Sequence, residues 1–325
     1  MWERKVLGLF ICLVFSFVAF AQVIWEFNFD TLTPGTIPSG WSQTPSVPSV
    51  PGVSTVVKWQ VISAGQVWGE PSTLRNFPST PNALYFGVVD AAKGTGSYRD
   101  GNSRVGYVLK TSGIPMPTPR PNHIRVSFSH LRQVEYYGTG DKEYDISEVL
   151  YQWESVLQTP SLKRWSSKDP SGKVWEKFES SAIEVPQNGS LVLQFKFDSV
   201  DGNFNNYFGW LIDNLVVEVY PLTITTVGLP AGTVGQIYSE TLEAVGGIGT
   251  YTWSVAKGYE LPPRLTLSST TGTISGTPER PGDYYVVFEV KDQTGKTSQK
   301  GFWIKIHPAD QTGYTIFEEK DFASG

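Results

Sequence analysis

The sequence predicts an all-β protein made of two successive β-sandwiches. Two observations lead to this prediction. Apolar and polar residues alternate in many short segments, whereas helical periodicity is nearly absent after the first 21 residues. The chain is also rich in aromatic residues (11 Trp, 15 Tyr and 18 Phe) and in the turn-forming residues Gly (32) and Pro (22). Aromatic strands separated by Gly and Pro turns are typical of all-β domains.

The clearest strand candidates are "VIWEFNFD" (23–30), "HIRVSFSHL" (123–131) and "SLVLQFKFD" (190–198). In each of them, apolar side chains occupy every second position, which indicates a strand with one buried face. The Pro-rich segments 44–54 and 114–122 are predicted to be loops, because strand patterns continue beyond both.

The domain boundary is predicted near "VYPLTITT" (219–226), where long aromatic strands give way to more closely spaced turns. Residues 22–220 are too many for one immunoglobulin-type module and suit a jelly-roll sandwich of two antiparallel sheets. Residues 221–308 have a common size for a single domain. The tail 309–325 shows no clear partner strand and is predicted to be mobile or the start of something truncated.

Residues 1–21 have the pattern of a secretory signal peptide. Arg4 and Lys5 precede an apolar run, and Ala19 and Ala21 form an A-x-A cleavage site. The alternative is an uncleaved membrane anchor, but the run is slightly short for a span. We therefore expect a secreted or cell-surface protein that does not span a membrane after cleavage.

The only cysteine, Cys12, lies within that signal. The mature chain would therefore contain no disulfide, no cysteine nucleophile and no thiolate metal site. The formal net charge is −5 and there is no basic run, which argues against nucleic acid as a partner.

The segment "LPPRLTLSSTTGTISGTPERPGDYYVVFEVKDQTGKT" (261–297) carries an ordered set of turns and strands. It resembles the bacterial putative-Ig family, a cadherin-like β-sandwich, over roughly residues 222–307. The resemblance predicts the fold more strongly than the function, since such modules serve as spacers, adhesion repeats and binding domains. Cadherin-like folds often bind calcium through acidic clusters, which would make Asp292 a ligand. The alternative is that Asp292 forms an ordinary hairpin turn.

The first domain carries "FNFDTLTPGTIPSGW" (27–41), "NALYFG" (82–87) and the closing strand "GWLIDNLVVEV" (209–219). Their order resembles the MAM-like and cleaved-adhesin jelly-rolls, including the "choice-of-anchor" class. In those families an ion commonly lies where the opening and closing strands pair. The resemblance thus implies a structural Ca²⁺ ion held by Asp30 and Asp213. Glu26, Asp198 and Asp201 are weaker candidates as metal ligands, and the alternation places Glu26 on one strand face with Asp30, so that both could reach the ion.

Asp213 also stands out without that resemblance. A two-residue period places Leu211, Asp213, Leu215 and Val217 on one face of the closing strand. An unpaired buried carboxylate costs several kcal/mol, so Asp213 needs a partner. The alternative to a metal ion is a set of backbone N–H groups in a bulge, with Asn214 helping.

No catalytic constellation emerges from the sequence. The three histidines, His123, His130 and His307, belong to no zinc-protease motif, and no G-x-S-x-G elbow is present. A hydrolase would need His123 or His130 beside an acid and a nucleophile in one cleft. We therefore expect a protein that is not an enzyme.

Two functions remain open. The first is adhesion or ligand binding at the bacterial surface, with a surface protein or glycan as the partner. The second is a carbohydrate-binding module of a polysaccharide-processing system. Sugar rings stack on exposed aromatic side chains, although most aromatics in a sandwich belong to its core. The candidate platforms are Trp41, Trp59 and Trp68, followed by Tyr136 and Tyr137.

Overall fold

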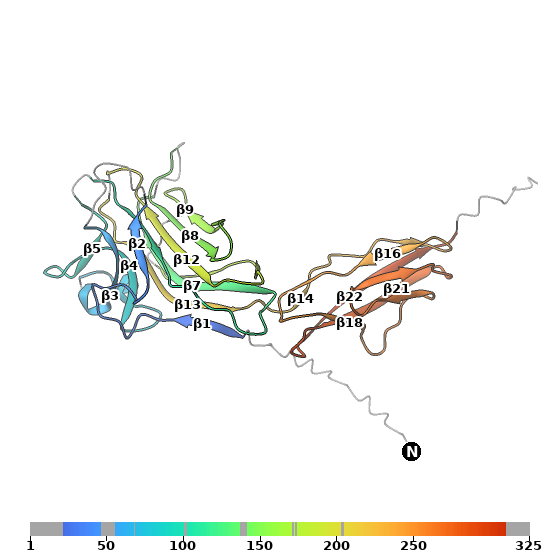
Figure 1. Ribbon diagram of the computed structural model, residues 1–325. Coiled ribbons are helices and arrows are strands. Elements are labelled where there is room, and N and C mark those ends of the chain that lie inside the picture. The colour runs from blue at the N-terminus through green and yellow to red at the C-terminus, as the bar shows by residue number, and fades with distance from the viewer. Residues whose placement is uncertain are drawn as a thin grey trace, which may run out of the picture.

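The computed structural model describes residues 22–46, 56–67, 69–100, 103–136, 142–170, 172, 174–202 and 205–309. It is almost entirely β-structure, arranged as two β-sandwiches side by side (Figure 1). The all-β prediction is therefore confirmed. The predicted signal peptide 1–21 and the tail beyond residue 309 lie outside the described residues. No helix in the described part of the chain has the length and apolarity of a membrane span.

The first sandwich contains thirteen strands and two short helical segments. The strands of its larger sheet are β1 (Val23–Phe27), β3 (Lys58–Ser63), β4 (Asn82–Asp90), β5 (Thr95–Ser97), β7 (His123–Gln133), β10 (Glu176–Glu179), β11 (Ile183–Glu184) and β13 (Gly209–Val219). Those of its smaller sheet are β2 (Ser42–Pro45), β6 (Gly106–Lys110), β8 (Ile146–Trp153), β9 (Ser161–Trp165) and β12 (Leu191–Asp198). The helical segments are η1 (Ala64–Val67) and α1 (Ser72–Arg75).

The larger sheet has the order β10-β7-β13-β4-β3, and β1 pairs with β13. The smaller sheet has the order β2-β6-β12-β8-β9. The alternating residues predicted from the sequence fill the space between the two sheets. Phe195 and Phe197 on β12 are fully buried there with Phe128 on β7 and Phe86 on β4. The opening strand β1 and the closing strand β13 are neighbours, as the resemblance implied.

A bulge in β13 changes which side chains face the core. The pairing of β13 with β7 shifts between Asp213 and Val216, and Asn214 adopts a left-handed backbone with φ +50°. Trp210 and Ile212 before the bulge share the main core with Leu215 and Val217 after it. Leu211 and Asp213 therefore lie on the opposite face of the sheet, because the extra residue reverses the alternation. The prediction that Leu211, Asp213, Leu215 and Val217 share one face is wrong for this reason.

The opposite face of the larger sheet is covered by the segment that contains η1 and α1. Val67, Leu74 and Phe77 from this segment pack against Leu211 and Tyr85 of the sheet in a second, smaller core. Both faces of the central strands are consequently buried, which explains why β4 is apolar at nearly every position. Asp213 lies on this covered face.

The second sandwich is smaller and follows directly. Its strands are β14 (Thr223–Ile224), β15 (Gly232–Thr233), β16 (Tyr238–Thr241), β17 (Ala244–Val245), β18 (Thr252–Val255), β19 (Leu265–Leu267), β20 (Thr273–Gly276), β21 (Gly282–Lys291) and β22 (Thr297–His307). A sheet β15-β22-β21-β18 packs against a sheet β16-β20-β19. Trp253, Phe288 and Phe302 are buried between them.

The two sandwiches are joined by hydrogen bonds as well as by the chain. The side-chain amide of Asn122, next to β7, donates to the carbonyl of Gly249 at 2.8 Å, and its backbone N–H donates to Gly247 O at 3.1 Å. His123 accepts the Gly246 N–H on Nδ1 at 3.2 Å, and its carbonyl accepts the N–H of Tyr220. The first residues of β7 therefore hold the 246–249 turn of the second sandwich in place.

Candidate functional site

The buried carboxylate of Asp213 is held by hydrogen bonds from two directions. Its Oδ2 accepts the backbone N–H of Ser79 at 2.8 Å, and its Oδ1 accepts the Ser79 hydroxyl and the Asn214 N–H, each at 2.8 Å. The positive φ of Asn214 in the bulge turns its N–H back toward the preceding side chain. The alternative interpretation, a carboxylate satisfied by backbone donors at a bulge, is therefore realised.

Asp30 shares this environment. Its Oδ1 accepts the Ser79 hydroxyl at 3.3 Å and the backbone N–H of Asn82 at 3.3 Å. Burial raises the pKa of Asp213, the hydrogen bonds from Ser79 and Asn214 lower it, and the charge of Asp30 raises it. The ion pairs among the described residues involve neither carboxylate. Two carboxylates thus lie together without a protein cation.

Carbonyl oxygens of the turn that contains Asp30 converge on the side-chain amide of Asn82. The Asn82 amide donates to the carbonyls of Phe29, Asp30 and Leu32, at 3.3, 3.1 and 2.9 Å. Hydroxyl, carboxylate and carbonyl oxygens are the ligand types that Ca²⁺ takes. Asp30 and Asp213 therefore fit one ion chemically, while their own hydrogen bonds also satisfy them without it.

Glu26 does not belong to this set. It is exposed on β1, opposite Val216 of β13, and no group of three or more acidic, His or Cys side chains converges within the described residues. Asp30 follows β1 in a turn rather than continuing the strand, so the two side chains do not share one face as expected. The prediction that Glu26 is a metal ligand is therefore corrected.

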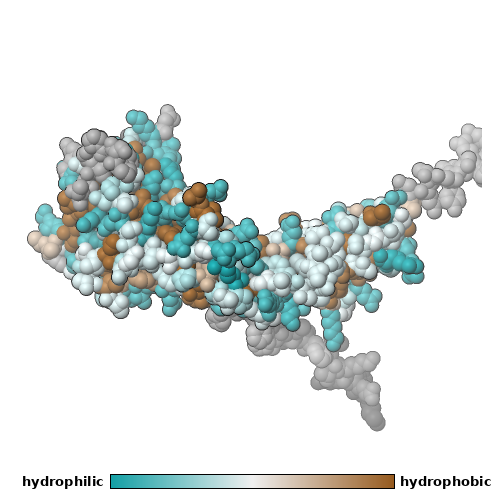
Figure 2. Space-filling model, in the orientation of Figure 1, coloured by the Kyte–Doolittle hydropathy of each residue, from teal (hydrophilic) through white to brown (hydrophobic). Residues whose placement is uncertain are grey.

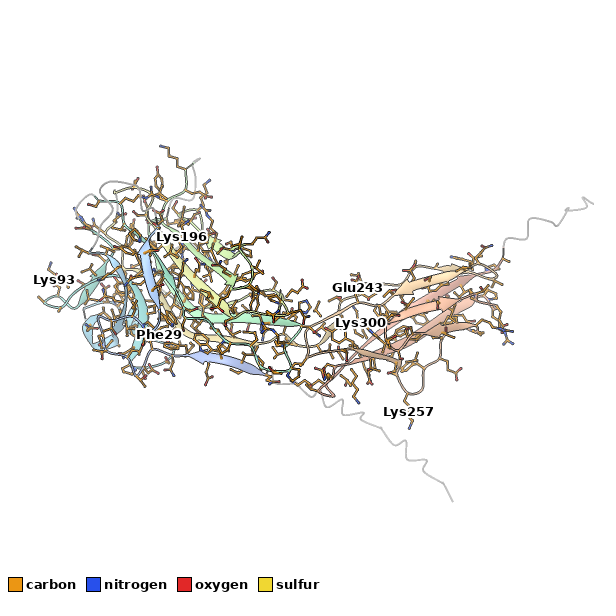
Figure 3. All side chains as sticks on the ribbon, viewed as in Figure 1. Phe29, Lys93, Lys196, Glu243, Lys257 and Lys300 are labelled. Atoms are coloured by element: carbon orange, nitrogen blue, oxygen red, sulfur yellow. The ribbon has the colours of Figure 1, made fainter. Side chains whose placement is uncertain are left out.

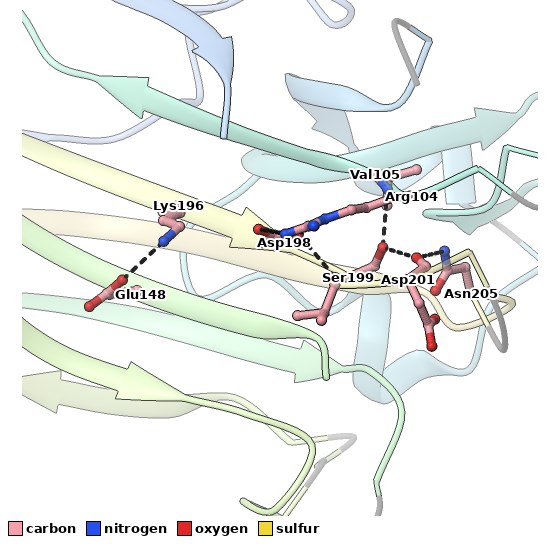
Figure 4. A network of polar contacts seen from close by, with 9 residues as sticks. Arg104, Val105, Glu148, Lys196, Asp198, Ser199, Asp201 and Asn205 are labelled. Atoms are coloured by element: carbon pink, nitrogen blue, oxygen red, sulfur yellow. Dashed lines mark hydrogen bonds and ion pairs between the residues drawn. The ribbon is translucent and has the colours of Figure 1, made fainter. Parts of the chain in front are cut away.

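The other acidic candidates have protein partners. Asp198 forms a bidentate ion pair with Arg104, with nitrogen–oxygen distances of 2.7 and 2.6 Å (Figure 4). In the same network the Ser199 hydroxyl donates to the carbonyl of Asp201. Asp292 caps its own hairpin turn, accepting the Thr294 and Lys296 N–H groups on Oδ1. The turn interpretation of Asp292 is therefore the one that the structure supports.

Two of the tryptophans predicted as sugar platforms, Trp41 and Trp59, are core residues. Trp59 is 0% exposed, donates from Nε1 to the carbonyl of Tyr107, and meets Phe86 and Trp210 edge to face. Trp41 is 7% exposed and packs against the phenylalanines of the opening segment. A ring enclosed in this way has no free face for a sugar, so both assignments are corrected. Trp68 and Tyr137 lie outside the described residues.

Tyr136 of the first sandwich is 54% exposed, and a group of exposed aromatic side chains lies on the second sandwich. Trp303 on β22, Tyr285 on β21 and Tyr259 in the turn after β18 are 64%, 45% and 41% exposed. Sequence reasoning missed them because it searched the first domain. The signal was present in "DYYVVFEV" and "GFWIKI", where Tyr285 and Trp303 occupy the outward positions of alternating strands.

A groove of about 850 Å³ lies where the two sandwiches meet. Asn122 and His123 of the first sandwich form one side of it. The second sandwich supplies Glu243, Tyr251 and several threonines, namely Thr225, Thr250, Thr252, Thr270 and Thr271. Figure 3 shows Glu243 at the end of the second sandwich nearest the first. Six of its fourteen lining residues thus carry hydroxyl groups, beside the apolar side chains of Leu242, Ala244, Val245 and Trp253. The groove falls within the usual volume range of small-molecule sites.

A smaller cavity of about 170 Å³ opens between the edges of the two sheets of the first sandwich. It is lined by His130, Arg132 and Trp165, with Asp169 and Glu176 at its mouth. Burial and the nearby Arg132 lower the pKa of His130 to about 4, so the imidazole is neutral at pH 7. Neither serine, threonine nor cysteine lines this cavity among the described residues. Among the described lining residues, His130 therefore has an acid nearby but no nucleophile.

A second buried carboxylate lies beyond this cavity. Asp145 precedes β8 with φ +48°, and its Oδ2 accepts the Tyr98 hydroxyl at 2.5 Å and the Glu135 N–H at 2.8 Å. Burial raises the pKa of Asp145 to about 7 in spite of these hydrogen bonds. The group is consequently divided between its neutral and charged forms near neutral pH.

Comparison with known proteins bears on the second sandwich most directly. Residues 220–307 match the family described as He_PIG: Putative Ig domain. This match confirms the resemblance predicted from the turn and strand pattern of 261–297. No curated protein matched the chain.

Several solved structures are similar to parts of the chain. A putative alpha-galactosidase from Bacteroides fragilis NCTC 9343 is 28% identical over 26% of this chain and 17% of its own, with a TM-score of 0.23. The K3 cleaved adhesin domain of Lys-gingipain from Porphyromonas gingivalis w83 is 12% identical over 61% of this chain and 98% of its own, with a TM-score of 0.33. The carbohydrate-binding module TmCBM61, solved with beta-1,4-galactotriose, is 13% identical over 55% and 88%, with a TM-score of 0.33.

The chain thus spans only 17% of the length of the galactosidase structures that it matches.

Proposed function

We propose that this chain is a non-catalytic, extracytoplasmic binding protein that attaches to a glycan through the groove between its two sandwiches. The observation that carries the proposal is the groove itself, whose walls come from both domains. Ligand sites occur preferentially at domain interfaces, where two surfaces meet in a concave shape. Binding to a glycan is also consistent with the adhesion that the sequence predicts for a surface protein.

The chemistry of the groove supports a neutral, hydroxyl-rich ligand. Threonine hydroxyls both donate and accept hydrogen bonds, as sugar hydroxyls do. The charged side chain on its wall is Glu243, and His123 is held neutral there by burial, which lowers its pKa. A strongly charged polymer would find little to pair with in such a site.

The junction keeps the groove in one shape. The amide of Asn122 and the imidazole of His123 bind the 246–249 turn, while Asp292 accepts the Ile248 N–H at 3.0 Å from the other side. A site that is already formed loses less conformational entropy when its ligand binds. The fixed junction therefore supports binding rather than a flexible connection.

Binding to a panel of neutral polysaccharides tests the proposal, with residues 22–325 as the parent protein. Thr250 is exposed on the groove wall, so Thr250→Trp should fill the groove without disturbing the core. We expect retention of the parent on at least one glycan and a loss of roughly tenfold in affinity for the variant. Thr266→Trp places the same ring on the exposed strand β19 and is the matched control. Equal binding of parent and Thr250→Trp would contradict the proposal.

We also propose that Asp30 and Asp213 hold a structural Ca²⁺ ion in the first sandwich. Two neighbouring carboxylates without a protein cation, with the Ser79 hydroxyl between them, support this role. The ion would join the opening segment to the closing strand and stabilise the domain, with no part in chemistry. Its presence is tested by the calcium dependence of unfolding described in the Discussion.

A further inference from the structure

The outer face of the sheet β15-β22-β21-β18 carries a row of aromatic side chains formed by Tyr259, Tyr285 and Trp303, here called the aromatic row. On β21 and β22, Val286, Phe288, Phe302 and Ile304 point into the sandwich and are buried. Tyr285 and Trp303 lie at the intervening positions and so point away from the core. The fold obtains its apolar burial from the other face and does not require these rings.

The rings are fixed in position by one another and by the sheet. Tyr285 and Trp303 are directly opposite in the β21–β22 register, with ring centroids 5.1 Å apart. Tyr259 extends the row, with its centroid 5.9 Å from that of Tyr285. Tyr285 also lies across Gly301, where a Cβ atom would collide with the phenol ring. The absence of a side chain at residue 301 thus lets Tyr285 lie along the sheet.

Cross-strand aromatic pairs stabilise sheets, and this role explains part of the arrangement. It does not explain why Trp303 stays 64% exposed at the open end of the row. Contiguous exposed aromatic groups on a soluble domain usually mark a binding surface. Tryptophan and tyrosine are the residues that contribute most at such surfaces, because their rings are large and rigid.

The surroundings of the row indicate what it binds. Opposite charges balance on this face, since Asp283 faces Lys305 across the strands and β21 also presents Glu289 and Lys291 there. The face therefore has no net charge to attract a polyanion or polycation. Val287 is the aliphatic side chain beside the row, so the surface lacks the broad apolar area of a lipid or protein contact. On the side in view in Figure 2, the second domain shows mainly residues of intermediate hydropathy.

We propose that the aromatic row is a platform for a neutral polysaccharide chain, separate from the groove. A pyranose ring presents an apolar face of C–H groups to an aromatic ring and hydroxyls at its edges to polar neighbours. Successive rings in the row are rotated by 69° and 51°, so they match a chain whose sugar units are rotated relative to one another rather than a flat ribbon. Glu289, Gln299 and Lys305 supply hydrogen-bonding groups along its edge.

The test is affinity electrophoresis of residues 22–325 in soluble xylan, galactan and mixed-linkage glucan, with polygalacturonate as the charged control. We expect the parent to be retarded by at least one neutral polymer and Trp303→Ala to lose roughly tenfold in affinity. Trp303→Phe keeps an aromatic ring and should recover most of the binding. Tyr207→Ala removes a ring that is 36% exposed on the first sandwich and should change nothing. Parent-like binding by Trp303→Ala, or no binding by the parent, would overturn the proposal.

Two other occupants of the row give different results. If a second copy covers it, sedimentation shows a concentration-dependent dimer that Trp303→Ala abolishes. If residues 310–325 cover it, a chain that ends at residue 309 exposes Trp303 more than the parent does. A dissolved quencher then reduces the tryptophan fluorescence of the shortened chain more than that of the parent. Either result contradicts a free glycan platform. Thr250→Trp leaves the row intact, so loss of binding in that variant alone points to the groove, and loss in Trp303→Ala alone points to the row.

Discussion

The hydroxyl of Ser79 lies between two carboxylates, 2.8 Å from Asp213 Oδ1 and 3.3 Å from Asp30 Oδ1. These residues come from the closing strand, from the segment that covers the larger sheet, and from the turn after the opening strand. The contact therefore ties together three parts of the first sandwich that are far apart in sequence. Its energetic role can be measured by removing one carboxylate at a time.

Asp213→Ala should destabilise the first sandwich by about 1–3 kcal/mol, because the partly buried N–H groups of Ser79 and Asn214 lose their acceptor. Added Ca²⁺ should raise the melting temperature of the parent and not that of the variant, since a ligand stabilises only the state that binds it. Thermal unfolding in Ca²⁺ and in EDTA measures both. Equal stabilisation of parent and variant by Ca²⁺ would remove Asp213 from the ion site.

Asn214 supplies the bulge with its left-handed residue. Asn214→Gly should be tolerated, whereas Asn214→Val should cost about 1–3 kcal/mol, because a β-branched residue is strained at φ +50°. Urea unfolding of the two variants gives the comparison. Similar stability of the Gly and Val variants would show that the bulge relaxes without penalty.

Trp59 and Trp303 should respond in opposite ways. Trp59→Ala removes a fully buried ring and should cost about 3–5 kcal/mol. Trp303→Ala removes an exposed ring and should change the stability by no more than about 1 kcal/mol. Denaturant titration of each variant separates a core tryptophan from a surface one. A large loss of stability in Trp303→Ala would make its role in the sheet structural.

The first sandwich should show two opposing pH effects between pH 4 and 7. In the folded protein the pKa of His130 is about 4, below its ordinary value of 6.5. The stability that the neutral imidazole contributes is therefore complete above pH 6.5 and is lost as the pH falls toward 4. In the folded protein the pKa of Asp145 is about 7, above its ordinary value of 3.8. The stability that the neutral carboxyl contributes is therefore complete below pH 3.8 and is lost as the pH rises through 7.

The Asp145→Asn variant separates these two effects. It keeps an acceptor for Tyr98 but does not titrate, so its stability should rise more steeply than that of the parent from pH 4 to pH 7. Each group changes the slope of the unfolding free energy against pH by at most about 1.4 kcal/mol per pH unit. Unfolding free energies at half-unit pH intervals measure the slopes. Parallel curves for parent and variant would show that Asp145 is charged throughout this range.

Much of the fold could be predicted because alternation reports burial directly. The strands around Phe128 and Phe195 and the turn pattern of the second domain followed from residue order alone. Which side chains of β13 share a face could not be predicted, because the bulge at Asp213 and Asn214 depends on pairing with a strand about ninety residues earlier. One additional residue in the ladder transferred Leu211 and Asp213 to the other side of the sheet.

The candidate sites were less predictable than the strands. The period of two identified Asp213 as unusual, but Ser79 carries no signal in its own sequence and reaches Asp213 only through the folded segment that covers the sheet. Trp59 looked like a platform because an aromatic in a strand is equally consistent with either face. Exposure depends on the second sheet, which sequence alternation does not identify.

The most direct test of the central claim combines retention on neutral polysaccharides with an assay for released reducing ends in the same samples. We expect that residues 22–325 are retained and that Thr250→Trp and Trp303→Ala each weaken retention. We also expect no reducing ends above the background of the polysaccharide alone. Failure of the parent to bind any neutral polysaccharide would contradict the claim of glycan binding. Release of reducing ends by the parent would contradict the claim that the protein is non-catalytic.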